Sequence, residues 1–337
     1  MKRIFLVALT LFTSLTSTSA FSAETVNIYS FRQPFLIEPI LEQFTAETGI
    51  KTKVVFSKKG LIERLKREGK YSPADLVLTS DFNKLLQLKG EGLTQEIKSE
   101  QIDKNVPSQF RDEAGHWVAL TKRARSLYVS KSSTLNTSTV SYEDLSGEAL
   151  SGKVCTRSGK HPYNLGLIAS MIAHHGEAET ETWLKGVKAN LARKPQGNDR
   201  GQVKAIKEGL CEVSLGNSYY YGKMLTDENQ KPWADAVNLV FPNQGNRGTH
   251  INVSGAVLTK YAPNKANAET LVAYLVGKSA QEQYASVNME YPVNPSVKPS
   301  EMVLSWGEFK EDNISLTEVA KYREQALQLV DKVKFDL

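Results

Sequence analysis

The chain has 337 residues, a formal net charge of +5 and two cysteines. That length is enough for two domains of ordinary size, each with its own core. The charge falls to +3 without the two basic residues at the N-terminus, and no run of five like charges occurs. Such a mild, scattered charge argues against a nucleic-acid partner.

The first 23 residues have the pattern of a secretory signal. A basic start (Lys2, Arg3) is followed by an apolar run over 4–15 and then by small residues. The run is shorter than the roughly 20 residues that span a bilayer. We expect export to the periplasm and cleavage within 20–24, with an uncleaved anchor as the alternative. No cysteine follows the run, so a lipid anchor is not expected.

The next hundred residues alternate strands and helices. Apolar residues recur at the helical period from Leu36 to Phe44, and Gly49 is suited to end that helix. A second helix is marked by Leu61, Ile62 and Leu65, and strands are predicted over 26–30, 50–56 and 74–78. This order predicts a parallel, doubly wound α/β sheet.

The same rhythm returns in the middle of the chain, which predicts a second α/β domain. Its strands are expected over 153–156 and 211–215, and its helices over 165–174 and 202–208. The predicted division is a first domain of 24–122 plus 246–300 and a second domain of 123–245, with hinges near 120–128 and 235–250.

The end of the chain is predicted to be helical. Helices are expected over 266–276, 280–287 and 316–334, and residues 301–337 form a C-terminal helical segment. The last helix carries one apolar stripe between Val319 and Val333. Core packing is the favoured interpretation of that stripe, and a partner-binding face is the alternative.

Tyrosines gather where a ligand is expected. Tyr219, Tyr220 and Tyr221 follow the 211–215 strand directly, and Tyr163 lies at the matching place after the 153–156 strand. Folds of this class bind ligands at the carboxyl ends of their strands. In a loop there, two adjacent phenols can point into one cleft, although packing of some of these tyrosines is also consistent with the pattern.

Gathered phenols suit a hard trivalent cation. A phenol has a pKa of about 10, so it ionises at neutral pH only beside a strong partner such as a metal ion. Three phenolates would neutralise Fe(III). The same residues could instead stack on a sugar or polyamine, or cage an organic cation.

A bound Fe(III) would leave coordination places for a small bidentate anion such as carbonate. Arg123 and Arg125 lie where the chain should cross between domains, and Ser158 lies in a turn that leads to the helix after Tyr163. Backbone N–H groups at a helix start bind anions. The alternative for the arginines is a solvated hinge or surface position.

The remaining reactive residues give weaker signals. Cys155 and Cys211 are 56 residues apart and should form a disulfide in an oxidising compartment, with two buried thiols as the alternative. His161 adjoins the tyrosines but is followed by proline, and His174 and His175 suit a helix end. No enzyme motif is present, so a periplasmic enzyme that uses the cleft is only a rival interpretation.

The chain resembles the ferric-ion-binding proteins of bacterial ABC iron importers over nearly its whole mature length. The resemblance is carried by short segments that are specific in combination: Asn27–Ser30, Ser72–Asp75, Arg123–Arg125, Val154–Gly159, Gly216–Tyr220 and Glu290–Asn294.

The resemblance implies a type II periplasmic-binding fold that closes on Fe(III), and a monomer that docks on an inner-membrane ABC permease. It implies Tyr163, Tyr219 and Tyr220 as ligands, with Tyr221 as a supporting aromatic. It also implies that Cys155 and Cys211 tie the two ligand-bearing strands together.

The chain departs from many relatives in one place. The position of their iron-binding histidine is Gln33 here. That change favours a site of three tyrosines plus an exogenous anion held by Arg123, with Gln33 and Ser158 as further candidates. A same-fold carrier of an organic cation, a polyamine or an iron chelate is the alternative.

Overall fold

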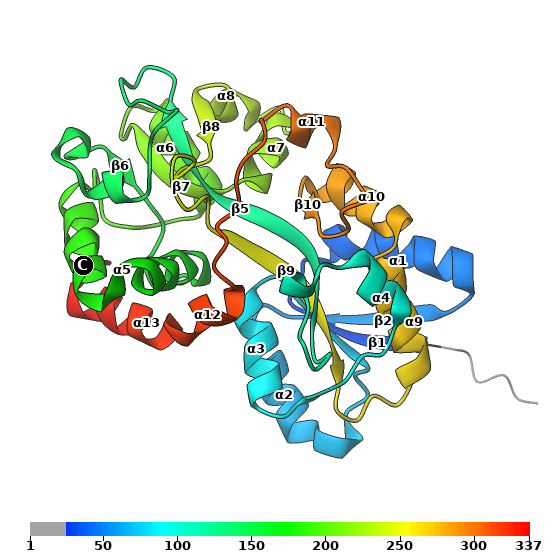
Figure 1. Cartoon of the computed structure of the whole chain (residues 1–337). Helices are drawn as coiled ribbons and strands as arrows, with labels where there is room; N and C mark the ends of the chain where they lie inside the picture. Colours follow the sequence, from blue (N-terminus) through cyan, green and yellow to red (C-terminus); the bar gives the residue numbers. More distant parts are fainter. Residues whose placement is uncertain (1–24) are drawn as a thin grey trace, which may run out of the picture.

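The computed structural model describes residues 25–337, so the signal predicted for residues 1–23 lies outside the described part. The described chain forms two lobes joined by long strands that continue from one lobe into the other (Figure 1). Each lobe has buried apolar side chains of its own.

The first lobe is built on three parallel strands in the order β2-β1-β3, with helices packed around them (Figure 1). Its helices and strands are β1 (Thr25–Ser30), α1 (Pro34–Thr48), β2 (Lys51–Phe56), α2 (Leu61–Glu68), η1 (Gly69–Tyr71), β3 (Leu76–Thr79), α3 (Phe82–Gly90), β4 (Thr94–Gln95), α4 (Glu100–Asn105), η2 (Ser108–Phe110), α9 (Lys265–Leu275), α10 (Lys278–Asn288) and β10 (Tyr291–Pro292). The short helix α11 (Glu301–Leu304) follows where the chain returns toward the second lobe (Figure 1).

The second lobe pairs β6 with β7 in parallel and surrounds them with helices. Its elements are η3 (Glu143–Ser146), η4 (Glu148–Leu150), β6 (Val154–Cys155), α5 (Pro162–Ala189), α6 (Asp199–Lys207), β7 (Val213–Asn217), α7 (Tyr219–Leu225), α8 (Lys231–Ala234), β8 (Val237–Val240), α12 (Leu316–Lys321) and α13 (Arg323–Lys332). Within α5 the backbone leaves the helical region at Gly176, just after the predicted helix end.

Two long strands, β5 (Val118–Ser130) and β9 (Ile251–Thr259), connect the lobes. They pair antiparallel with each other, and β9 also pairs antiparallel with β3. The parallel pairing predicted for the strands at 26–30, 50–56 and 74–78 is confirmed, and β5 and β9 add antiparallel pairs to it. A chain that passes between two lobes and returns beside itself must run in opposite directions, which makes the sheets mixed.

The cores divide the chain close to the two crossings. Apolar residues up to Leu120 and from Ile251 to Val293 belong to the first lobe's core, and those between Leu127 and Val240 belong to the second lobe's. The stripe from Val319 to Val333 packs into the core of the second lobe, so it serves as core rather than as a partner-binding face.

The predicted helix over 316–334 is two helices, which corrects that expectation. The break lies at Tyr322, whose backbone (φ −96°, ψ 5°) leaves the helical region. Helix α12 contacts α3 of the first lobe as well as α5, whereas α13 packs along α5 in the second lobe. The change of direction lets the chain end cover both the boundary between lobes and the second core.

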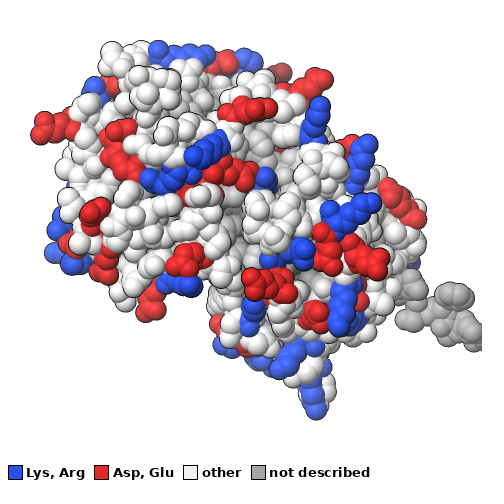
Figure 2. Space-filling model, viewed as in Figure 1, with Lys and Arg blue, Asp and Glu red and all other residues white. Residues whose placement is uncertain are grey.

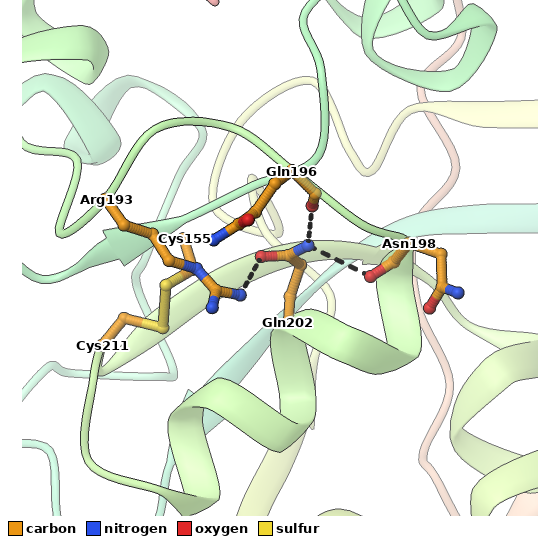
Figure 3. Close-up of a disulfide and its surroundings, with 6 residues drawn as sticks. All are labelled: Cys155, Arg193, Gln196, Asn198, Gln202 and Cys211. Atoms are coloured by element: carbon orange, nitrogen blue, oxygen red, sulfur yellow. Dashed lines mark hydrogen bonds between the residues drawn. A yellow bond between two sulfur atoms is a disulfide. The ribbon is translucent and has the colours of Figure 1, made fainter.

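The disulfide predicted between Cys155 and Cys211 is present (Figure 3). It joins β6 to the residues just before β7, and the two Cα atoms are 5.9 Å apart. Nearby, Gln202 of α6 donates to the carbonyl of Gln196. The two strands that precede the tyrosines are thus joined covalently.

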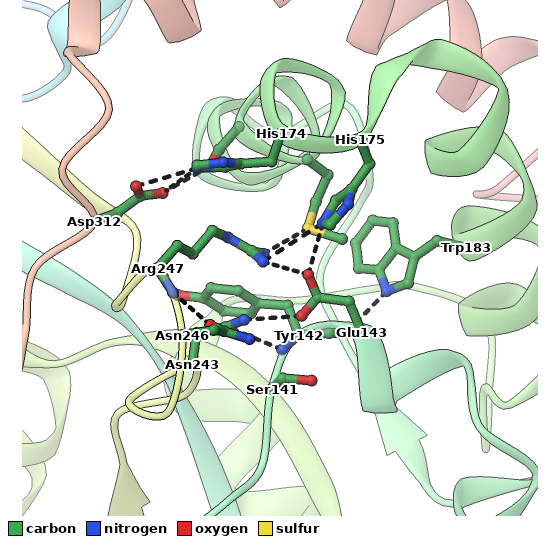
Figure 4. A network of polar contacts seen from close by, with 12 residues as sticks. Ser141, Tyr142, Glu143, His174, His175, Trp183, Asn243, Asn246, Arg247 and Asp312 are labelled. Carbon is green, nitrogen blue, oxygen red and sulfur yellow. Dashed lines mark hydrogen bonds and ion pairs between the residues drawn. The ribbon is translucent and has the colours of Figure 1, made fainter.

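A polar network holds the second crossing, residues 241–250, to the second lobe (Figure 4). Glu143 accepts hydrogen bonds from Asn243 at 2.9 Å and from Arg247, and it pairs with His175 at 2.8 Å. His174 pairs with Asp312 at 2.8 Å. The two histidines therefore bind carboxylates, whereas the sequence pattern favoured a capping role.

Charged side chains of both signs are intermixed on the face shown in Figure 2, with no broad region of one sign. Within residues 25–337, no helix is long and apolar enough to cross a membrane.

Candidate metal-binding cleft

A cavity of about 640 Å³ lies between the lobes, at the carboxyl ends of β1, β3, β6 and β7. The sequence placed the ligand at these strand ends, and the predicted tyrosines line this cavity. The lining residues are Phe31, Arg32, Gln33, Phe35, Leu36, Lys58, Ser80, Asp81, Lys84, Arg123, Arg157, His161, Pro162, Tyr163, Arg200, Tyr219, Tyr220, Lys223, Asp227, Asn288 and Glu290.

The structure brings Tyr163, Tyr219 and Tyr220 together. The hydroxyl oxygens of Tyr163 and Tyr219 are 3.5 Å apart, and the ring centroids of Tyr219 and Tyr220 are 4.1 Å apart. Two oxygen ligands at right angles on a metal, with bonds of about 2 Å, are roughly 3 Å apart. A small contraction would therefore let these phenols share one metal ion.

The adjacent tyrosines stand at the start of a helix and not in the loop that the sequence suggested. Helix α7 begins at Tyr219, directly after β7 and Ser218. Successive helical residues are about 100° apart, so Tyr219 and Tyr220 share the cavity while Tyr221 points elsewhere. Tyr221 packs edge-on against Trp306, with ring centroids 5.8 Å apart.

The end of β7 is held from behind by Tyr128 of β5. The Tyr128 hydroxyl donates to the carbonyl of Asn217 at 2.7 Å. The ring lies where a side chain on Gly216 would be, since a Cβ there would come within 2.0 Å of it. A residue without a side chain is therefore needed just before the ligand segment.

Tyr163 is placed by the first turn of α5. His161 is the N-cap residue, and its Nδ1 accepts a hydrogen bond from the Tyr163 backbone N–H at 3.2 Å. Burial, reinforced by the charge of Arg157, lowers the pKa of His161 to about 3. The imidazole is thus neutral at neutral pH and able to accept. His161 is partly buried and lines the cavity, beside the tyrosines as its position in the sequence suggested.

Three guanidinium groups surround the Tyr163 ring. Those of Arg123, Arg125 and Arg157 lie 5.6, 5.9 and 5.4 Å from the ring centroid. The ring of Tyr163 therefore lies among three positively charged side chains.

Arg123 and Arg125 are buried, not solvated hinge residues. Arg123 is 2% exposed and donates to the Ser254 hydroxyl at 3.0 Å and to the carbonyl of Ser80. Arg125 pairs with Asp199 at 2.9 Å, and Arg157 pairs with the other oxygen of Asp199 at 3.0 Å. A buried carboxylate thus balances two of the three guanidiniums.

The first lobe contributes a buried ion pair that the sequence analysis did not single out. Arg32 pairs with Glu290 at 2.8 Å and also donates to Ser254. Glu290 begins one of the segments that carry the resemblance and precedes β10, whereas Arg32 follows β1 outside those segments. In the sequence, Arg32 could have been singled out by its position directly after a predicted strand.

Of the three residues predicted to hold the anion, two line the cavity and one does not. Arg123 and Gln33 line the cavity. Ser158 is not among the lining residues, and its hydroxyl donates to Asp336 at 2.5 Å.

The phenols of Tyr219 and Tyr220 are held as neutral groups in the free protein. Burial raises the pKa of Tyr219 well above its ordinary value, and the neighbouring phenols of Tyr163 and Tyr220 raise it further, while Arg123 opposes them. Burial also raises the pKa of Tyr220. A cation that displaces these protons would be needed to ionise them.

Within residues 25–337, no three His, Cys, Asp or Glu side chains gather as a metal site. In this part of the chain, a metal site built on the phenols would therefore rest on tyrosine oxygens and not on the commoner ligand types. Seven basic and three acidic side chains line the same cavity, so its surroundings are positive.

Comparison with known proteins agrees with this geometry. The family of bacterial extracellular solute-binding proteins matches residues 71–309. Iron uptake protein A1 of Synechocystis is 39% identical over 91% of this chain and 86% of its own length.

Solved structures extend the similarity to the fold. The apo ferric ion-binding protein A of Pasteurella haemolytica is 52% identical, with a TM-score of 0.89 over 94% of this chain and 99% of that one. A Trichodesmium protein solved with iron and citrate ligands is 36% identical, with a TM-score of 0.87 over 92% of this chain and 99% of that one.

The chain belongs to the bacterial extracellular solute-binding protein family, and its fold is the two-lobed α/β type II periplasmic-binding fold. The resemblance seen in the sequence is confirmed.

Proposed function

We propose that this protein is a periplasmic carrier that binds Fe(III) and delivers it to an inner-membrane ABC permease, without catalysing a reaction. One observation carries the proposal: Tyr163, Tyr219 and Tyr220 reach a single cavity from two helix starts. Relatives similar over nine-tenths of the chain are described as iron uptake and ferric ion-binding proteins.

The proposed ligands are the three phenolate oxygens. Together they carry the charge that neutralises Fe(III), and hard oxygen donors suit a hard trivalent ion. The three guanidiniums around the Tyr163 ring place positive charge beside the proposed site. Remaining coordination places go to a small anion such as carbonate, held by Arg123 and Gln33. We leave Ser158 out of this set because its hydroxyl is engaged by Asp336.

The two lobes are the units that would close on the cargo. The crossings at β5 and 241–250 are the proposed hinges. Iron can favour the closed arrangement only through contacts that are better there than in the open one. Lys223 of α7 already donates to the carbonyl of Val287 of α10 at 2.5 Å, so contact across the cavity mouth is available.

The positive charge of the cavity lining indicates which alternative cargo is most compatible with the site. Seven basic side chains disfavour an organic cation or polyamine as the cargo. The second candidate is therefore a ferric chelate, in which an anionic chelator enters with the metal. It would use the same phenols and differ in the identity of the anion.

The test is a visible absorption spectrum of the purified protein before and after addition of Fe(III) with bicarbonate. A broad phenolate-to-iron charge-transfer band is expected for the wild type, and it should be lost or shifted in Tyr219→Phe. Tyr221→Phe is the matched control and should keep the band. A wild type with no band under either condition would reject the ferric proposal.

A further inference from the structure

The C-terminal end of the chain binds the loop that leads to Tyr163. One carboxylate oxygen of Asp336 accepts from the Gly159 backbone N–H at 2.7 Å, and the other accepts from the Ser158 hydroxyl at 2.5 Å. These are the donors that an exogenous anion would use in the turn after β6. The chain's own carboxylate, 178 residues away from Ser158, occupies them instead.

Apolar packing next to these hydrogen bonds also holds the chain end against the loop. Phe335 is 3% exposed and belongs to the second lobe's core. A Cβ on Gly159 would come within 2.8 Å of the Phe335 ring and 3.0 Å of Val330. The loop and the chain end therefore lie directly against each other. Lys188 adds hydrogen bonds to the carbonyls of Val333 and Lys334, which anchor the end to α5.

A short series of hydrogen bonds connects this contact to Tyr163. The carbonyl of Ser158 accepts from the His161 backbone N–H and from the Asn164 side chain, both at 3.1 Å. His161 then accepts from the backbone of Tyr163, and the two rings meet edge-on with centroids 4.6 Å apart. A shift of Ser158 would therefore move the N-cap that sets the direction of Tyr163.

We propose that Asp336 is a positioning residue for iron binding, which holds the 157–161 loop so that the phenol of Tyr163 meets those of Tyr219 and Tyr220. The inference rests on the proposed function. Asp336 does not line the cavity, so it acts through the loop and not on the metal. Groups that hydrogen-bond a metal ligand directly typically change metal affinity by about 10–100-fold when they are removed, and Asp336 acts one residue further out, so we expect an effect at the lower end of that range.

The first variant is Asp336→Ala, which removes both acceptors. The iron-loaded variant should show a weaker or shifted charge-transfer band, and it should lose iron to a competing chelator about tenfold faster than the wild type. Asp336→Asn keeps one oxygen acceptor and should be intermediate. These readouts report on the metal, and a contact that only stabilised the chain end would leave them unchanged.

Asp331→Ala is the matched control. Asp331 is a C-terminal carboxylate that pairs with the same loop, but only through the exposed side chain of Lys160. It should leave the band and the release rate at wild-type values. Ser158→Ala removes one of the two donors without changing the chain end. It should show part of the effect expected for Asp336→Ala, and it keeps the test available if Asp336→Ala does not fold.

The outcomes separate the two proposals. A wild type without a charge-transfer band would reject ferric binding itself. A normal wild-type band with unchanged spectra and release rates in both Asp336→Ala and Ser158→Ala would overturn the positioning role alone, even if thermal stability fell. Equal effects of Asp331→Ala and Asp336→Ala would also overturn it, because they would point to loop charge and not to the backbone contact.

Discussion

The guanidinium of Arg125 donates to Asp199 at 2.9 Å, and both side chains are almost completely buried behind the tyrosines. Asp199 also accepts from Arg157 and from the Asn217 backbone N–H. Although burial alone opposes its ionisation, the two arginines hold the pKa of Asp199 below its ordinary value. One carboxylate thus connects the loop before Tyr163 with the strand before Tyr219.

Removing that carboxylate should be costly. Asp199→Ala leaves the buried guanidinium of Arg125 and the partly buried one of Arg157 without their counter-charge, and we expect a loss of roughly 3–5 kcal/mol in the free energy of unfolding. Urea unfolding of the apo protein measures it. Asp235→Ala, which breaks an exposed pair with Lys231, should cost about 1 kcal/mol or less. Similar losses of unfolding free energy in the two variants would contradict the role of Asp199 as a buried counter-charge.

A methyl group at Gly216 should disturb the ligand segment. The added Cβ would overlap the Tyr128 ring, so Gly216→Ala should destabilise the protein by roughly 1–3 kcal/mol and weaken iron binding by shifting Asn217. Thermal unfolding and iron titration test both effects. Gly245→Ala meets nothing within 4 Å and should match the wild type. Full iron affinity in Gly216→Ala would show that the strand end adapts.

Iron binding should release protons from the phenols. Burial raises the pKa values of Tyr219 and Tyr220, so these groups are protonated at neutral pH and must lose protons to bind the metal. Affinity should therefore rise with pH, by about tenfold per pH unit for each proton released, and fall on acidification. Competition with a chelator between about pH 5 and pH 8 measures the slope.

The proton count also tests the ligand set. Tyr220→Phe should release one proton fewer per iron than the wild type in a weakly buffered titration, whereas Tyr221→Phe should leave the count unchanged. An iron affinity that did not vary with pH would exclude neutral phenols as the ligand precursors.

The disulfide should stabilise the fold without being needed for the iron chromophore. Replacing both Cys155 and Cys211 by serine opens a bridge between residues 56 positions apart, and we expect a loss of about 2–4 kcal/mol. Chemical denaturation with and without a reductant measures it, since the reductant should affect only the wild type. The position of the charge-transfer band should be retained. A variant as stable as the oxidised wild type would contradict this role.

Much of this architecture could be predicted from local patterns. The helical period from Leu36 to Phe44, the short apolar strands and the glycines that end helices are properties of neighbouring residues. The tyrosines could be grouped because each follows a predicted strand, and strand ends meet at one edge of a sheet. The disulfide could be predicted because the chain has two cysteines and an export signal that leads to an oxidising compartment.

Other features depended on which distant segments meet. Lys122–Arg125 was read as a polar crossing, but Arg123 and Arg125 are buried within β5 because Ser254 and Asp199 supply their partners. Arg32 likewise depends on Glu290.

The sequence by itself determined the two α/β units, the grouping of Tyr163, Tyr219 and Tyr220 and the family, because these rest on short-range periodicity and on motif order. Only the tertiary structure decided which charges are buried, that β5 and β9 are long crossing strands, and that Asp336 takes the donors of Ser158 and Gly159. The physical reason is that a charge is stable in the interior only beside a partner, and those partners come from parts of the chain that no local pattern connects.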